Sequence, residues 1–353
     1  MPPTINDLAR VLTTYPSDWQ PSHIEPLGSA GGMSGAEFWR INTPRGIFAL
    51  RRWPIEHPAP ARLRFIHAVL RHAAANGCRV LPLPVTTHAG ETFVRHAGYL
   101  WELSPWMPGV ADYECEPTVA KLRAALRVLA QFHAAVEDFD QSAAPDSAGG
   151  FNAMQRHLNR VKELSPITIN ALSREISDST WPDLAPLARD FLSRLPTAID
   201  RAVARLETLN SAPLPLQPCI KDIWHDHVLF TGNQVTGVVD FGAVDIDTPA
   251  TDISRLLSSL ASLTPRPFRE EQGAGSITPT TTQEIWSQGL AAYQESRLLS
   301  PAEIAAARAL ATSGTILAGC NWIRWIYADG RQFENPNRII DRFRRITQAI
   351  SAI

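Results

Sequence analysis

The stretch CIKDIWHDHVLFTGNQVTGVVDFGAVDIDTPATD, residues 219–252, carries the most informative pattern of the chain. Asp222 and Asp240 each stand at the edge of an apolar run. Between them, V-L-F (228–230) and V-T-G-V-V (235–239) flank the turn T-G-N-Q, which predicts two short strands joined as a hairpin. Such a hairpin can hold two carboxylates on one side of a cleft.

Two carboxylates in that arrangement suit phosphoryl transfer. One carboxylate orients the attacking hydroxyl, and the other holds Mg²⁺ against the phosphates of a nucleotide. We therefore interpret Asp222 and Asp240 as candidate catalytic residues. The alternative interpretation is a pair of turn or helix-cap residues, which the spacing and the apolar flanks favour less.

The composition is that of an ordinary globular enzyme. Of 353 residues, 44% are hydrophobic and 19% charged, and the formal net charge of -2 gives no overall attraction to nucleic acid. No apolar run reaches the roughly 18 residues that span a bilayer. The four cysteines form no C-x-x-C pair, which favours a reducing compartment. We expect a cytoplasmic protein with no nucleic-acid or membrane partner, and the oligomeric state stays open.

The chain divides into a small β-rich lobe, residues 1–107, and a larger helical lobe, residues 108–353, with the boundary at a Met-Pro-Gly break. In the first lobe, strand-like runs are EFWRI (37–41), GIFALRRW (46–53), RVLPLPV (79–85) and ETFVRHAGYLWELSPW (91–106), and residues 59–76 have helical spacing. Two prolines restrict residues 79–85 to an edge strand or an extended piece. Helical patterns cover residues 4–14, 117–137, 151–163, 183–208, 253–262, 280–296, 301–328 and 336–352.

A glycine-rich segment, GSAGGMSG (28–35), stands immediately before the first of these strands. Glycines let backbone N–H groups approach phosphate oxygens, and Arg51 follows one strand later, within reach of an α- or β-phosphate. A flexible turn beside a solvated basic strand is the alternative. The candidate phosphate-binding residues of the segment are Gly28, Ser29, Gly31, Gly32 and Ser34.

Taken together, these segments resemble the aminoglycoside phosphotransferase/choline kinase-like family, which are small-molecule kinases related to protein kinases. The resemblance covers about residues 23–330 and implies an α+β fold with two lobes, protein-kinase-like: a small antiparallel sheet with one helix, then a mainly helical lobe. The matching motifs are Gly28–Gly35, Ala49-Leu50-Arg51, Trp106-Met107-Pro108-Gly109, Leu129–His133, Asp222–Phe230, Asp240-Phe241-Gly242 and Asp247-Thr248-Pro249 with Asp252.

The resemblance also implies roles for single residues. Asp222 accepts or orients the hydroxyl proton of the acceptor, Asp240 binds Mg²⁺, and Arg51 contacts the phosphates of ATP, with GTP as the alternative nucleotide. Asp252 supports the catalytic loop. The segment that pairs with the adenine edge is the backbone of Glu102, Leu103 and Ser104.

Three departures from the family pattern motivate a second hypothesis. Ile220 stands where the family has a histidine, with Lys221 in place of a small residue. His227 stands where the family has a metal-binding asparagine, and imidazole suits Mn²⁺ better than Mg²⁺, with Asp226 as a neighbouring oxygen ligand. Residues 57–90 contain no acidic residue that could pair with the phosphate-binding cation. A catalytically impaired pseudokinase that binds a nucleotide or small ligand is therefore the alternative function. The run W-H-D-H (224–227) suggests a zinc-dependent hydrolase as a third reading, although consecutive ligands rarely converge.

The acceptor is expected on the helical lobe, facing the catalytic loop. Carboxylates would favour a cationic acceptor, whereas Arg324 would favour one bearing a carboxylate, so both stay open. We predict transfer of the γ-phosphate of ATP to a hydroxyl of an aminoglycoside, aminoalcohol, sugar or homoserine-like molecule. The candidate acceptor-binding residues are Trp224, Asp226, Asp245, Trp322 and Trp325.

Overall fold

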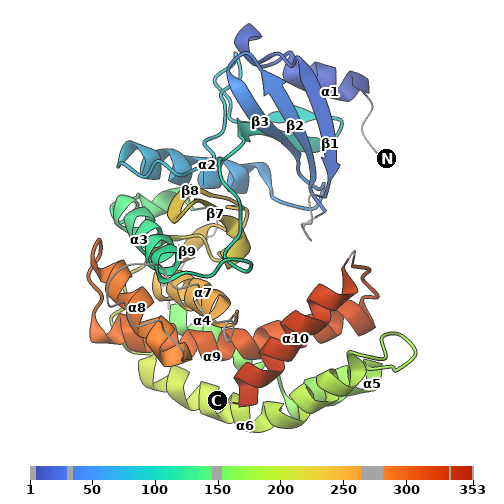
Figure 1. The fold of residues 1–353 in the computed structure, drawn as a ribbon, viewed down its shortest axis with the longest axis vertical. Helices are drawn as coiled ribbons and strands as arrows, with labels where there is room; N and C mark the ends of the chain where they lie inside the picture. Colours follow the sequence, from blue (N-terminus) through green and yellow to red (C-terminus); the bar gives the residue numbers. More distant parts are fainter. Residues whose placement is uncertain (1–4, 30–34, 145–152, 264–280, 334, 352–353) are drawn as a thin grey trace.

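A computed structural model describes residues 5–29, 35–144, 153–263, 281–333 and 335–351. It has an antiparallel sheet from the first third of the chain and a mostly helical remainder, with helix α2 between the two (Figure 1). This confirms the predicted fold class. None of the described helices is both long enough and apolar enough to cross a membrane.

The strands are short and the helices dominate the second part. The strands are β1 (His23–Gly28), β2 (Glu37–Thr43), β3 (Gly46–Arg52), β4 (Val94–His96), β5 (Tyr99–Pro105), β6 (Gln217–Cys219), β7 (Val228–Thr231), β8 (Gln234–Val238) and β9 (Asp245–Asp247). The helices are α1 (Ile5–Leu12), α2 (Pro60–Ala75), α3 (Val119–Ala135), α4 (Ala153–Lys162), α5 (Pro166–Glu175), α6 (Ala185–Leu209), α7 (Ala250–Ala261), α8 (Thr282–Gln294), α9 (Pro301–Ile323) and α10 (Pro336–Ser351).

The five-stranded sheet has the order β1-β2-β3-β5-β4 with antiparallel neighbours. Alternation places Ile41, Leu50 and Leu103 on its buried face, where α1 covers them. In the β3–β5 register, Arg51 lies opposite Glu102. The sheet therefore brings the predicted phosphate-binding cation next to a carboxylate from another strand.

The structure has no strand at residues 79–85, which leaves the extended piece of the two predicted alternatives, and one helix was missed. Residues 79–85 form no strand, because prolines 82 and 84 have no N–H to donate. A hydrogen bond from the N–H of Val85 to the carbonyl oxygen of Leu103 joins this run to β5. Helix α5 was not predicted. It begins with Ser165 as its N-cap and a proline in its first turn, a start signal that the sequence does contain.

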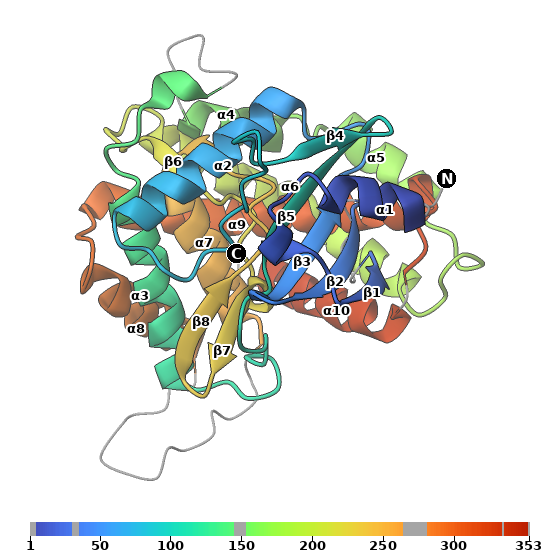
Figure 2. The same ribbon diagram turned by 90° about the horizontal axis from the view of Figure 1, so that it is seen from above.

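Helix α2 packs mainly on the helical part, although it follows the sheet strands in sequence. Phe65, Ile66, Val69 and Leu70 belong to the large core that α3, α7 and α9 also line, whereas Leu63 packs in a small cluster with residues of the sheet. Seen from above, α2 lies beside the sheet and the β7–β8 hairpin lies next to α3 (Figure 2). Helix α2 thus joins the sheet to the helical core.

The connection after β5 is fixed to the hairpin. Val110 and Phe230 exchange backbone hydrogen bonds of 2.9 and 2.8 Å, and the hydroxyl of Thr236 donates to the carbonyl oxygen of Pro108. Gly109, between them, has a φ of +94°. A Cβ on Gly109 would overlap the hydroxyl of Thr236 and lie 2.7 Å from the carbonyl oxygen of Phe230, so only glycine fits.

We predict that Gly109→Ala destabilises the protein by about 1–3 kcal/mol more than Gly98→Ala. Both positions have a left-handed backbone, but the space around Gly98 is open, so the control carries the backbone strain without the overlap. Urea unfolding of the two variants measures the difference. Equal losses would mean that the close approach to the hairpin relaxes at no cost.

Candidate active site

The backbone of the loop that carries Asp222, the candidate catalytic residue, is held by one buried carboxylate. Asp252, in the first turn of α7, accepts hydrogen bonds from the N–H groups of Ile220 and Lys221 at 2.6 and 2.7 Å, and it contacts Nε2 of His133 at 3.0 Å. Lys221 has a φ of +63°, a conformation costly for a residue other than glycine. The predicted supporting role of Asp252 thus has a geometric basis, with its oxygens on the N–H groups next to Asp222.

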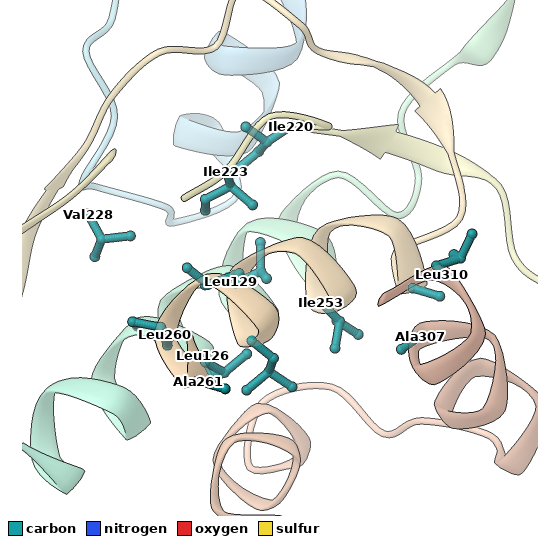
Figure 3. Packing of buried hydrophobic residues seen from close by; sticks show 14 of the residues in the cluster. Leu126, Leu129, Ile220, Ile223, Val228, Ile253, Leu260, Ala261, Ala307 and Leu310 are labelled. Atoms are coloured by element: carbon teal, nitrogen blue, oxygen red, sulfur yellow. The ribbon is translucent and has the colours of Figure 1, made fainter. Parts of the chain in front are cut away.

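The side chains of the loop are held by packing. Ile220 and Ile223 are buried, and Figure 3 shows them above the helices that carry Leu126, Leu129 and Ile253. Because both isoleucines face the core, the intervening Asp222 remains partly exposed at the surface of the loop. Ile220 therefore braces the loop through apolar contact, at a position where the family has a histidine.

Asp222 has one occupied carboxylate oxygen and one open one. Its Oδ1 accepts hydrogen bonds from Nε1 of Trp224 at 2.7 Å and from Nη1 of Arg255 at 3.0 Å. Its Oδ2 has no hydrogen-bond partner among the described residues. The two donors fix the plane of the carboxylate and leave Oδ2 to receive another group.

Asp240 ends the hairpin in a left-handed conformation, with a φ of +63°. His227 lies between it and Asp226. Nδ1 of His227 is 2.8 Å from the carbonyl oxygen of Asp222 and therefore carries the hydrogen, so the lone pair of Nε2 points away from the loop. That Nε2 is 3.9 Å from Oδ2 of Asp240 and 3.9 Å from Oδ1 of Asp226.

These three side chains can hold a divalent cation. Oδ1 of Asp226 is buried and has no hydrogen-bond partner in the described part of the chain. Burial raises the pKa of Asp226, but the charges of the neighbouring imidazoles, Arg342 and Arg338 lower it by more than burial raises it. The pKa therefore lies below its ordinary value, and the carboxylate is charged. An ion such as Mg²⁺ or Mn²⁺ needs only a few protein ligands of this kind, because phosphates and waters complete its shell.

A second group of potential metal ligands serves a structural role. His133, Cys219 and Asp252 come together in the core. However, Asp252 already binds two backbone N–H groups and the imidazole, and burial raises the pKa of Cys219 well above its ordinary value, which keeps the thiol protonated. In the W-H-D-H run, Nδ1 of His225 contacts Ser259 while His227 contacts the loop, so the two imidazoles do not share one ligand site.

Arg51 connects the sheet to the hairpin. Its Nη1 is 3.6 Å from Oδ1 of Asp240, and its guanidinium stacks on Trp53 with 3.3 Å between Cζ and the ring centroid. Glu102, opposite on β5, contacts Nε2 of His67 at 2.7 Å. Helix α2 thus supplies a histidine where protein kinases supply a glutamate, and the carboxylate beside the cation comes from the sheet.

The remaining nucleotide-site candidates are placed as follows. Gly28 ends β1 and Ser29 follows it, whereas Gly31, Gly32 and Ser34 lie outside the described residues. Within β5, Ser104 pairs with Ala49, and the carbonyl oxygen of Leu103 accepts the N–H of Val85. The backbone groups of Leu103 and Ser104 thus pair with β3 and with the segment at Val85. The side chain of Glu102 points to His67 of α2.

The acceptor-site candidates do not all gather at Asp222. Trp224 contacts it directly, and Asp226 lies in the adjacent metal-ligand group. Asp245 is bound by Arg62 at 3.0 Å and by Lys221 at 3.4 Å, away from the open oxygen. Trp322 is buried in α9 against Phe333, and Trp325 packs on it edge-to-face.

Sequence reasoning missed three residues of the site. Arg255 lies one turn beyond Asp252 on α7, Arg342 lies on α10, and His67 lies on α2 in contact with Glu102. The spacing of Asp252 and Arg255 could have placed Arg255 near the loop. Nothing in the local pattern marks Arg342, because its distance from Asp222 is set by how α10 packs.

We predict a pH-dependent effect of Glu102→Gln. Burial raises the pKa of Glu102. The hydrogen bond and charge of His67 and the charge of Arg51 lower it by more than burial raises it, so the pKa lies below its ordinary value of 4.5. The carboxylate therefore adds stability above that pH, and this contribution is lost as the pH falls from 4.5 through the lower folded-state pKa.

The free energy of unfolding should accordingly fall in Glu102→Gln most at neutral pH, and the gap to the wild type should narrow on acidification. Urea unfolding across this range measures it. Glu91→Gln, at an exposed ion pair, is the control and should change stability by less than about 1 kcal/mol. A gap for Glu102→Gln that stays constant or widens in acid would contradict the assignment.

Comparisons with known proteins bear on the family and the fold of the chain. Residues 23–285 match the profile of the Phosphotransferase enzyme family (APH). Among curated proteins, a homoserine kinase of Methylobacterium nodulans is 28% identical over 278 residues, covering 79% of this chain and 73% of the relative. A homoserine kinase of Methylocella silvestris is 24% identical over 324 residues, covering 90% and 86%.

Solved structures share the fold at low identity. An aminoglycoside phosphotransferase of Alicyclobacillus acidocaldarius aligns with a TM-score of 0.61 and 19% identity, over 100% of this chain and 96% of that one. A spectinomycin phosphotransferase in complex with ADP and spectinomycin aligns with a TM-score of 0.65 and 12% identity, over all of both chains. An amicoumacin kinase in complex with AMP-PNP and Ca²⁺ aligns with a TM-score of 0.64 and 15% identity, over 98% and 92%. Because the family profile matches well over half of the sequence, the chain belongs to the Phosphotransferase enzyme family.

Proposed function

We propose that the protein transfers the γ-phosphoryl group of ATP to a hydroxyl of a small molecule. The observation that carries this proposal is the pairing of Asp222, with one open carboxylate oxygen, and a neighbouring group of cation ligands built from Asp240, His227 and Asp226. We assign nucleotide binding to residues 1–107 and acceptor binding to residues 108–353.

In the proposed reaction, the hydroxyl proton of the acceptor moves to Oδ2 of Asp222 as the hydroxyl oxygen forms a bond to the γ-phosphorus. The bond from that phosphorus to the β,γ-bridging oxygen breaks, and ADP leaves. The protein contributes alignment and charge rather than covalent chemistry. Trp224 and Arg255 hold the carboxylate that receives the proton.

The residues that would meet the nucleotide are Arg51 and the glycine-rich segment. Arg51 stands opposite Asp240, so its guanidinium and a cation bound by Asp240 would face the same phosphates. The glycine-rich segment that begins at Gly28 would cover them. A bound Mg²⁺ or Mn²⁺ would neutralise phosphate charge, held by Asp240, His227 and Asp226. Relatives of this fold have been solved with ADP, with AMP-PNP and with GDP. These complexes support a purine nucleotide, and we propose ATP for this chain.

The three sequence departures each have a structural substitute, which favours the phosphotransferase over the pseudokinase. Asp252 and His133 hold the loop where Ile220 replaces a histidine. His227 presents Nε2 toward Asp240 in place of an amide oxygen. Glu102 supplies the carboxylate beside Arg51 that α2 lacks.

We predict that Asp222→Asn lowers the rate of phosphotransfer by roughly 10²- to 10⁴-fold, because the amide cannot accept the hydroxyl proton. The amide oxygen can still accept the bonds from Trp224 and Arg255, so the loop should stay folded. Nucleotide turnover by wild type and variant measures the effect. Asp178→Asn, at an exposed ion pair with Arg189, is the control and should keep full activity.

Asp222→Asn should also keep its stabilisation by AMP-PNP with Mg²⁺, whereas Asp240→Asn should lose it. This second measurement separates loss of chemistry from loss of binding. Full phosphotransfer by Asp222→Asn would contradict the proposed function.

We further predict that His227→Asn shifts the metal preference of the enzyme. Imidazole nitrogen favours Mn²⁺ over Mg²⁺, whereas an amide oxygen suits Mg²⁺. The ratio of activity with Mn²⁺ to activity with Mg²⁺ should therefore fall by several-fold in the variant. An unchanged ratio would show that His227 braces the loop through Nδ1 and does not bind the metal.

A further inference from the structure

Two guanidinium groups lie against the tryptophan that contacts the catalytic carboxylate. Cζ of Arg255 is 4.9 Å from the ring centroid of Trp224, and Cζ of Arg342 is 4.7 Å from it. Arg342 also lies 5.5 Å from the ring of Trp322. Nε1 of Trp224 and Nη1 of Arg255 both donate to Oδ1 of Asp222, so the ring of Trp224 lies between Arg342 and the carboxylate that receives the acceptor hydroxyl.

The carboxylates around this place are already neutralised. Asp226 pairs with Arg338 at 3.7 Å, and Glu114 contacts Arg338 and Arg345, with 3.3 Å to Nη1 of the latter. Asp222 pairs with Arg255. Arg342, in contrast, makes no hydrogen bond or close ion pair within the described residues; its guanidinium lies over two indole rings and interacts with the charges of Asp226 and Asp222 only at longer range.

Arg342 is therefore a surplus cation in a partly desolvated position. Burial is the largest cause that lowers the pKa of its guanidinium, and the charges of Arg338 and Arg345 on the same helix lower it further. The charges of Asp226 and Asp222 raise the pKa by less than these causes lower it. Stacking on indole rings uses the face of the guanidinium and leaves its N–H groups at the edge free. A planar fork of donors held in this way matches an oxyanion.

A cationic acceptor has fewer places to bind. Asp245 is engaged by Arg62 and Lys221, and Asp247 is buried against Arg156, His157 and Lys221. An amine would have to displace one of these partners and would be repelled by the unpaired guanidinium. The charges beside the open oxygen of Asp222 thus select against the acceptors that the carboxylates had suggested from the sequence.

We propose that the acceptor carries an oxyanion, a carboxylate or a phosphate, which Arg342 binds together with Arg255 while the hydroxyl of the acceptor meets Asp222. This inference rests on the proposed phosphotransfer and specifies its substrate class. The charge of the oxyanion completes the environment of Arg342, and the two contact points orient the hydroxyl toward the γ-phosphate.

The test uses matched probes that differ only in the oxyanion: L-homoserine against L-homoserinamide, and glycerol 3-phosphate against glycerol, with kanamycin as a cationic acceptor. Each probe is added to the full chain with Mg²⁺ and either AMP-PNP, for thermal unfolding, or ATP, for turnover. At least one oxyanion member should bind about 10- to 100-fold more tightly than its partner, the range of a charge-assisted hydrogen-bonded contact. Tighter binding of L-homoserine would identify the oxyanion as a carboxylate, and tighter binding of glycerol 3-phosphate would identify it as a phosphate.

The same probes are applied to Arg342→Gln, Arg342→Lys and Arg344→Gln, after thermal unfolding of each variant without ligand shows that it is folded. Arg342→Gln should remove the preference for the oxyanion, and Arg342→Lys, which keeps the charge without the fork, should retain part of it. Arg344→Gln is the control, because Arg344 is exposed and pairs with Asp341 on the same helix. It should leave the preference unchanged.

The outcomes separate this inference from the function on which it rests. Binding of an oxyanion probe that depends on Arg342, without its phosphorylation, would support the oxyanion site and count against phosphotransfer. Phosphorylation of kanamycin or glycerol in preference to the oxyanion probes would support phosphotransfer and overturn the oxyanion site. Equal binding within both pairs, or a preference that survives in Arg342→Gln, would also overturn it.

Discussion

The site depends on the carboxylate of Asp252. It is fully buried and binds the backbone N–H groups of the two residues that precede Asp222. A hydrogen bond to a charged group is worth about 1.5–3 kcal/mol, and a buried N–H left without a partner carries a comparable cost. Removing this carboxylate would release the strained loop that aims the catalytic side chain. The position of Asp222 is thus determined from helix α7.

His133 and Tyr293 complete the support beneath the loop. Burial lowers the pKa of His133 more than Asp252 raises it, so the imidazole is neutral. Nε2 donates to Asp252, and Nδ1 accepts from the hydroxyl of Tyr293 at 2.7 Å. The network is satisfied at every atom and joins α3, α7 and α8 under the loop, so a change in any of these helices is transmitted to the catalytic carboxylate.

Sequence patterns were sufficient where the chemistry is local. The hairpin, the strands β2 and β3, and the helices other than α5 follow from alternation, turn residues and spacing within short windows. The positions of Asp222, Asp240 and His227 near one another follow from the hairpin alone. The chain of contacts from Asp226 to Asp240 through His227 lies within fifteen residues of sequence.

The parts that escaped prediction depend on packing between distant segments. The backbone of Glu102 was predicted to meet the adenine edge, but the contact of its side chain with His67 of α2 was not foreseen. Arg342 is more than one hundred residues from Asp222, and only the packing of α10 against α6 and α9 places it on Trp224. Asp245 was a candidate for the acceptor, but Arg62 of α2 binds it. Partners so far apart in sequence leave no periodic signal.

The proposed function requires that a loop with Ile220 and His227, at positions where the family has a histidine and an asparagine, still forms a working nucleotide and metal site. Calorimetric titration of AMP-PNP into the full chain, with Mg²⁺, with Mn²⁺ and with neither ion, tests this most directly. The structure predicts binding that requires a divalent ion and is tighter with Mn²⁺, because His227 directs a nitrogen toward Asp240. No binding of AMP-PNP with either ion would contradict the account.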